Sequence, residues 1–171
     1  MKKIFATVLL MLAILAIVGY AGAASSVTQQ ASVTISPVIA LSGPATIDFG
    51  TVADSTAGST PLTVTNTLTD GSNMAIDVYT RANDTKMVNT DSSITDVITP
   101  IQFTPHGGSA TAYTTGYQMA YANWPKPVQG GAPVTWGQVL NINVPSYTNN
   151  GTYVVTIYNT AVAHGAVAPT P

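Results

Sequence analysis

Apolar and polar residues alternate along several short segments of this chain. The clearest case runs from Ile47 to Asn66, where apolar side chains recur at every second position on both sides of a segment of Asp, Ser, Thr and Gly. A period of two is typical of half-buried β-strands, and these four residue types favour turns. The pattern predicts a strand over 47–51, a polar turn, and a strand over 61–66.

Similar alternation predicts further strands. Pro100 interrupts the segment 94–103, which we interpret as an edge strand or two short strands. The spacing of Tyr113, Tyr117 and Tyr121 fits one face of a helix or of a strand, and the surrounding Thr and Gly residues favour a strand. The other predicted strands begin at Ser32 or cover 75–80, 139–144 and 153–158.

Turn signals separate these segments, the strongest being Asp70-Gly71 and Asn150-Gly151, which are typical of tight hairpins. In the strand over 75–80 we expect Ile76 and Val78 to face inward and Asp77 and Tyr79 to face outward. About seven or eight short strands with no convincing amphipathic helix indicate an all-β fold, a two-sheet β-sandwich with Greek-key connections.

The N-terminus has the order of parts of a secretory signal peptide. A basic Met-Lys-Lys start precedes a run of apolar residues and Thr from Ile4 to Val18, and small residues follow, with Ala21 and Ala23 placed as in an A-x-A cleavage site. We therefore divide the chain into a signal peptide over 1–23, an N-terminal arm over 24–31, a β-sandwich over 32–160 and a flexible C-terminal tail over 161–171. The protein is expected to be secreted or held at the cell surface, and to meet the membrane only through its signal peptide during export.

Charge is scarce. Without the leader, three Lys or Arg stand against seven Asp and no Glu, and three minus seven gives a formal net charge of −4. Charged residues form 7% of the whole chain, against roughly 25% in ordinary soluble proteins. Such a surface suits a subunit packed against its neighbours, and three cations cannot form a nucleic-acid site. There is no Cys, so the core must stabilise the fold without disulfides.

Two stretches carry a family resemblance. Asp48-Phe49-Gly50-Thr51-Val52, followed by Gly58 and Val64-Thr65-Asn66, resembles the opening of many secreted immunoglobulin-like surface domains. Asn143-Val144-Pro145 with Asn150-Gly151-Thr152-Tyr153 resembles their closing hairpin. The resemblance implies an immunoglobulin-like sandwich of the kind found in bacterial and archaeal surface proteins and in filament subunits that donate a strand to a neighbour. It implies an adhesive or structural role and no catalytic residue.

The sequence gives little support for a catalytic role or for a bound cofactor. The two histidines, His106 and His164, lie beside glycines in predicted loops, and there is no nucleophile elbow or Glu. We therefore expect a protein that is not an enzyme and has no cofactor. Calcium is a weaker alternative for one polar loop, whose oxygen ligands do not follow the EF-hand spacing and whose aspartates more often form turns. That loop contains Asn83, Asp84, Asn89, Asp91 and Asp96.

Two sequons and one aromatic segment are candidate surface sites. Asn83-Asp84-Thr85 and Asn150-Gly151-Thr152 are N-x-[ST] acceptors for glycans, although the second is also explained by turn chemistry. An aromatic group either stacks on surface glycans or a neighbouring subunit, or covers one end of the core. This group consists of Tyr113, Tyr117, Tyr121 and Trp124.

The arm carries the functional hypothesis. Val27, Ala31, Val33 and Ile35 share one parity, with Gln29 as the polar exception. This is the pattern of a strand without a local hairpin partner, which either forms the first strand of its own sandwich or pairs with an open sheet edge of a second copy. We expect a structural subunit that forms a homopolymer by strand donation. The alternative is a monomeric adhesion or carbohydrate-binding module.

Overall fold

The structure is a computed structural model that describes residues 28–52 and 59–171. The chain divides at Ser36 into two units. The described part of the first unit, residues 28–35, contains no helix or strand, and its side chains are exposed. The predicted signal peptide and Val27 lie outside the described residues, as do residues 53–58 of the predicted turn over 53–60.

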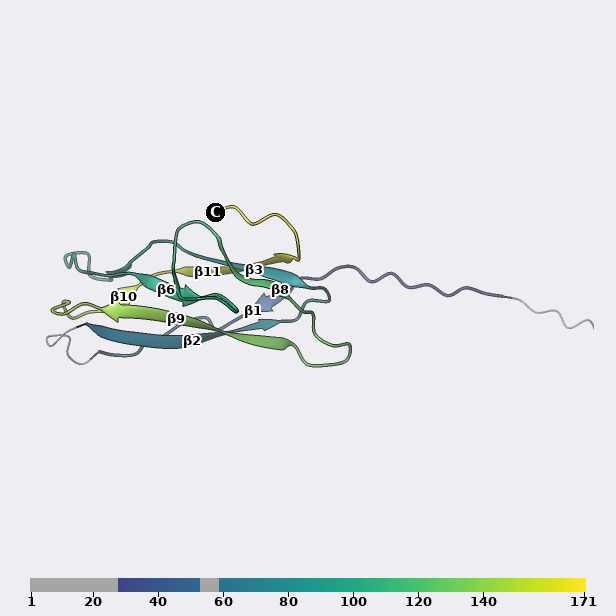
Figure 1. Cartoon of the computed structure of the whole chain (residues 1–171), viewed down its shortest axis with the longest axis horizontal. Coiled ribbons are helices and arrows are strands. Elements are labelled where there is room, and N and C mark those ends of the chain that lie inside the picture. The colour runs from purple at the N-terminus through teal and green to yellow at the C-terminus, as the bar shows by residue number, and fades with distance from the viewer. Residues whose placement is uncertain (1–27, 53–58) are drawn as a thin grey trace, which may run out of the picture. The chain divides into compact units, whose positions relative to one another are not determined.

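The second unit, from Ser36 onward, is an all-β sandwich whose strand pairs are all antiparallel. Figure 1 shows β2 and β9 in one layer and β3, β8 and β11 in the other. The strands are β1 (Leu41–Ser42), β2 (Thr60–Asp70), β3 (Ile76–Ala82), β4 (Met87–Asn89), β5 (Val97–Ile98), β6 (Ile101–Thr104), β7 (Thr111–Ala112), β8 (Gln118–Trp124), β9 (Val134–Val144), β10 (Tyr153–Val154) and β11 (Ile157–Ala163).

Three sheets make up the sandwich. The largest has the order β1-β2-β9-β6-β7, the opposing sheet has the order β11-β3-β8, and a small third sheet has the order β10-β4-β5. The all-β sandwich prediction is therefore confirmed, with eleven described strands in place of seven or eight, because several strands have only two residues.

The core lies between the two larger sheets and contains side chains from both. Leu140 and Phe103 come from the first sheet, and Ile76 and Val78 from the second. All four are at most 1% exposed. The predicted alternation holds in β9, where Leu140, Ile142 and Val144 are buried and their neighbours are less so.

The predicted hairpins are wrong. Asp70-Gly71 does turn the chain, with the Asp70 carboxylate accepting the Ser72 N–H at 2.8 Å, but β2 and β3 then enter different sheets. The turn after β9 likewise leads to β10 and β11 in the other two sheets. A turn motif fixes a local reversal, whereas pairing depends on which distant strand covers the apolar face. The long strands of this sandwich pair only with partners far away in the sequence.

Strand positions near the N-terminus also differ from prediction. The residues from Ser32 to Ala40 contain no strand, and the segment 47–52 covers the core without joining a sheet. Residues 36–40 instead bond with the loop after β2, where Gly71 donates to the Ala40 carbonyl and Asn73 to the Val38 carbonyl.

Four further predictions concern the middle and the end of the chain. The ambiguous segment around Tyr121 forms a strand, β8, and Pro100 does separate two short strands, as predicted. The predicted outward positions of Asp77 and Tyr79 are wrong, because these residues are 4% and 8% exposed. The tail predicted from 161 begins later, since β11 continues to Ala163.

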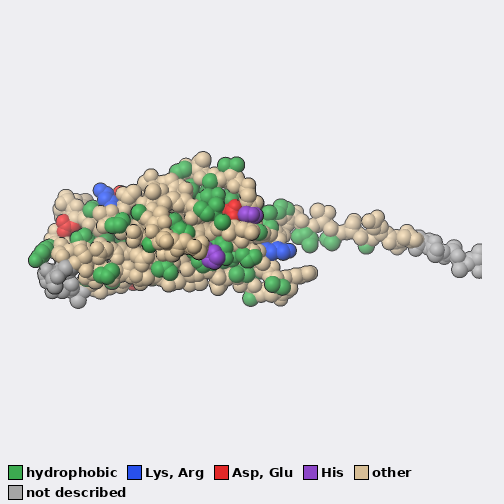
Figure 2. Space-filling view, in the orientation of Figure 1, with side chains coloured by type: hydrophobic (Ala, Val, Ile, Leu, Met, Phe, Trp, Pro, Cys, Tyr) green, Lys and Arg blue, Asp and Glu red, His purple; other side chains and the backbone are tan. Residues whose placement is uncertain are grey.

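The surface is poor in charge, as the composition requires. Figure 2 shows one face on which Lys, Arg, Asp and His side chains are few and scattered over a largely neutral surface. Within the described part of the chain, no helix is long and apolar enough to cross a membrane.

Candidate functional site

Two long strands of the sandwich have an open edge. β2 pairs with β9 along its whole length, but on its other side it meets β1 only at Thr69 and Asp70. β11 pairs with β3 alone. Among the described residues, no backbone group bonds to the outer edge of β2 from Thr60 to Leu68, and that of β11 accepts only a local bond at its end, from the Ala166 N–H to the Ala163 carbonyl at 2.9 Å. Unpaired edges of this length are templates for pairing with another chain.

A groove lies between these edges and consists of two cavities that share four lining residues, Ile47, Phe49, Met87 and Tyr153. The first cavity, of about 490 Å³, is lined by Asn66 and Leu68 of β2 and by Ile157 and Asn159 of β11. The second, of about 750 Å³, is lined by Leu62, Ile142 and Val144 and by the turn 147–152.

The segment 43–52 covers this groove from inside the same chain. Ile47, Phe49 and Val52 are half-buried and pack against the core. Among the described residues, the segment makes one internal hydrogen bond, from the Gly50 N–H to the Asp48 carboxylate at 2.8 Å, and none to β2. The cover therefore shields apolar side chains but leaves the backbone edge of β2 unpaired.

The floor of the groove contains buried amides. Asn66 is 2% exposed and donates through Nδ2 to Oε1 of Gln138 at 3.1 Å. Asn66 Oδ1, Gln138 Nε2 and Asn159 Oδ1 are buried and have no partner among the described residues. Gly43 lies directly beside Asn66 Oδ1, since a Cβ on Gly43 would be 3.8 Å from that oxygen. Buried polar atoms without partners are rare in folded proteins, because each costs free energy.

The positions of the buried amides in the alternating pattern are a sequence signal for this polar floor. Asn66 occupies a core-facing position in the alternating run Leu62, Val64, Asn66, Leu68 of β2. Asn159 does the same in β11, where it lies opposite the fully buried Thr80. An amide at a core parity is a candidate for a polar contact, but the pattern alone does not show that the two amides line one cavity.

The four side chains of the predicted aromatic group lie in different environments, and two of them fit the core alternative better than a contact surface. Tyr113 and Trp124 are buried in the core, at 2% and 1% exposure. Burial raises the pKa of Tyr113 to about 12, although a hydrogen bond with Thr80 works in the opposite direction. Tyr117 lies apart from them, with its hydroxyl 3.1 Å from Thr160 Oγ1.

Tyr121 and Trp124 do stack, with ring centroids 5.0 Å apart, in a cluster that the sequence did not reveal. Trp136 of β9 meets both rings edge-on, and His106 stacks on Tyr121 at 3.9 Å. His106 therefore covers an aromatic ring, and the side chains of this cluster pack β8 against β9.

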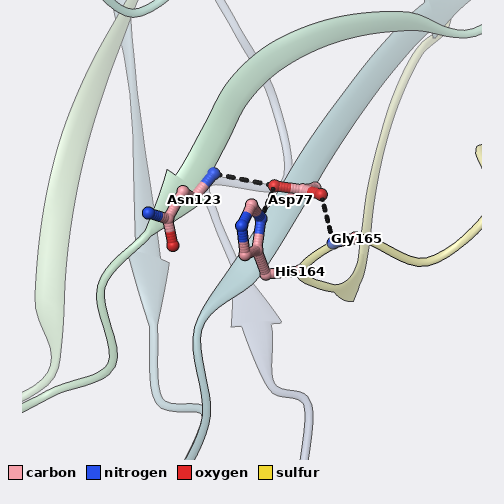
Figure 3. A network of polar contacts seen from close by, with 4 residues as sticks. All are labelled: Asp77, Asn123, His164 and Gly165. Atoms are coloured by element: carbon pink, nitrogen blue, oxygen red, sulfur yellow. Dashed lines mark hydrogen bonds and ion pairs between the residues drawn. The ribbon is translucent and has the colours of Figure 1, made fainter.

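His164, the second histidine, belongs to a polar network around Asp77 (Figure 3). Asp77 Oδ1 lies 2.8 Å from His164 Nδ1 and accepts the Asn123 N–H at 2.7 Å, while Oδ2 accepts the Gly165 N–H at 2.9 Å. This network explains why Asp77 is buried on a face predicted to be outward. It also holds the start of the C-terminal tail against β3.

The network predicts a pH dependence of stability. Burial alone raises the pKa of Asp77, but the hydrogen bonds from Asn123, Gly165 and His164 outweigh burial and leave the pKa below its ordinary value of 3.8. A depressed folded-state pKa stabilises the protein above pH 3.8, and this contribution is lost as the pH falls through the lower folded-state value. Urea unfolding between pH 6 and pH 2 should show a weaker pH dependence in Asp77→Asn than in the unaltered protein. The same pH dependence in both would contradict this role.

The side-chain oxygens of the polar loop considered for calcium already accept hydrogen bonds from within the protein. Asp91 accepts from the Ser93 N–H and hydroxyl, Asp84 from the Thr85 N–H, and Asp96 from the Asn149 N–H. Asn89 accepts from the Asp91 N–H. No three His, Cys, Asp or Glu residues of the described chain gather as ligands for a metal ion.

Both sequon asparagines are exposed. Asn83 Oδ1 already accepts the Thr156 N–H at 2.8 Å. Asn150 precedes Gly151, whose φ of 144° and close approach to Asn89 leave no room for a Cβ. Glycosylation at either position remains a prediction.

Comparison with known proteins adds no family. No protein-family model matches the chain, and no curated protein matches it significantly.

Proposed function

We propose that this protein is a secreted, immunoglobulin-like surface subunit that polymerises by β-strand donation, with the arm of one copy pairing along the β2 edge of the next. The groove between β2 and β11 carries the proposal, because it combines an unpaired backbone edge, a partly apolar lining and unpartnered amides. An added strand supplies main-chain hydrogen bonds to the edge and side chains to the groove.

The arm matches the groove in pattern and length. Ala31, Val33 and Ile35 share one parity, and Val33 and Ile35 are 85% and 78% exposed. Fully extended, residues 28–35 span about 26 Å, and the free edge of β2 from Thr60 to Leu68 spans about 30 Å. The low surface charge also favours polymerisation, because it causes little electrostatic repulsion between closely packed copies.

A peptide experiment tests the proposal in its simplest form. A labelled peptide of residues 24–35 should bind the mature protein that lacks residues 24–31, raising its fluorescence anisotropy and the melting temperature of the protein. A scrambled peptide of the same composition should do neither. Equal behaviour of the two peptides would contradict strand acceptance.

The cover over the groove should compete with the incoming arm. Phe49→Ala removes a half-buried ring from the cover, which lowers the free energy of unfolding of the subunit by about 1 kcal/mol. Since the cover and the arm compete for the groove, the variant should also polymerise several-fold faster, measured by light scattering. Thr51→Ala, an exposed position in the same segment, is the matched control. Slower polymerisation of Phe49→Ala would show that the cover helps to receive the arm.

A further inference from the structure

Two asparagines that line the groove, Asn66 and Asn159, each have a buried side-chain oxygen without a partner among the described residues. Resting on the proposed function, we infer that Gln29 of one copy binds Asn66 and Asn159 of the next, and that the arm runs antiparallel to β2. The partner is a second copy of this chain, and the recognised group is one carboxamide within an otherwise apolar strand face.

The two strands carry complementary patterns. The groove-facing side of β2 presents Leu62, Val64, Asn66 and Leu68, with one amide among apolar side chains. The arm face with Ala31, Val33 and Ile35 is interrupted once, at Gln29. A pairing that places amide beside amide leaves the remaining apolar positions facing each other.

The hydrogen-bonding capacities also fit. Asn66 Oδ1 and Asn159 Oδ1 are two buried acceptors without partners, on residues that line the same cavity. A glutamine Nε2 carries two N–H donors, one for each acceptor. With the same face of the arm turned inward, a register that places Ala31, Val33 or Ile35 at Asn66 would leave these acceptors facing an apolar side chain. A buried polar contact of this kind is a known device for specifying register.

The strand direction follows from the ends of the groove. If the arm ran parallel to β2 with Gln29 at Asn66, Val33 would fall opposite Asp70, where β1 already pairs. In the antiparallel direction Val33 lies opposite Leu62 and Ile35 opposite Thr60. Both then reach the second, larger cavity, which is lined by Leu62, Ile142 and Val144.

Substitution of neighbouring glutamines tests the role of Gln29. Gln29→Leu should raise the concentration needed for polymerisation at least about tenfold, because two buried acceptors lose their donors. Gln30→Leu, the same substitution on the opposite strand face, should change that concentration by less than about twofold. Equal effects of the two substitutions would overturn the inference.

Cysteine pairs test the register itself, and the natural chain has no Cys to interfere. The antiparallel register places Ser32 directly opposite Thr63, on the outer face, where both are exposed. Mild oxidation of Ser32→Cys/Thr63→Cys polymers should give a covalent ladder on a denaturing gel, whereas Ser32→Cys/Thr65→Cys should not, because diagonal positions are too far apart.

The outcomes separate the inference from the proposed function. A ladder from the Ser32/Thr65 pair, or from neither pair in polymers that do form, would overturn the register and leave strand donation standing. If the unaltered mature protein forms no polymer at all, strand donation fails and the register falls with it.

Discussion

Mature protein carrying Val33→Asp and Ile35→Asp should be a monomer at concentrations where the unaltered protein is fully polymerised. These two positions share the parity that the proposal directs into the groove, and two carboxylates there would lose their hydration among apolar side chains. A cost of several kcal/mol per buried charge corresponds to a loss of affinity of a thousandfold or more. Analytical ultracentrifugation measures the result directly.

The matched control uses the other face of the same arm. Ser32→Asp/Thr34→Asp adds the same charge within the same four residues, but on the face that remains in solvent. It should polymerise with at most a severalfold change in the required concentration. If both variants are monomeric, added charge alone explains the loss, and the parity argument is wrong. If both polymerise normally, the arm is not donated.

Trp124→Ala should lower the free energy of unfolding by about 3–5 kcal/mol. Trp124 is 1% exposed, stacks on Tyr121 and meets Trp136 edge-on at 6.1 Å, so its removal leaves a large cavity between β8 and β9. Urea or thermal unfolding measures the change. Val128→Ala, at a position that is 80% exposed, should stay within about 0.5 kcal/mol of the unaltered protein.

This prediction separates two accounts of the aromatic segment. A Trp124 that served to bind sugars would be dispensable for folding, and its loss would weaken glycan binding at unchanged stability. That result would contradict the buried position of the ring. A large loss of stability is expected instead, because the ring is part of the core.

The fold class could be predicted from sequence because alternation is a local property. The alternation in β9 and the break at Pro100 report burial and backbone constraints within a few residues, and both agree with the structure. Pairing could not be predicted in the same way. Asp70-Gly71 turns the chain as expected, yet β2 pairs with β9, whose residues lie more than sixty positions further on. The choice among distant strands depends on how the whole core packs.

The same distinction between local and long-range features applies to the candidate site. The arm could be recognised in sequence, because an apolar parity without a nearby partner is visible there. The groove could not, since it is formed by the edge of β2, the edge of β11 and the cover at 43–52 only after folding. The burial of Asp77 likewise could not be predicted from its local sequence. Its position in the alternation indicates a solvent-facing side chain, but His164 and Gly165, almost ninety residues later, bind its carboxylate.

Electron microscopy of the purified mature protein, with and without residues 24–31, tests the central claim most directly. The account predicts ordered filaments from the intact mature protein and dispersed single subunits from the shortened one, with both forms folded to the same stability. Dispersed monomers in both samples, or filaments of equal length in both, would contradict polymerisation by donation of the N-terminal arm.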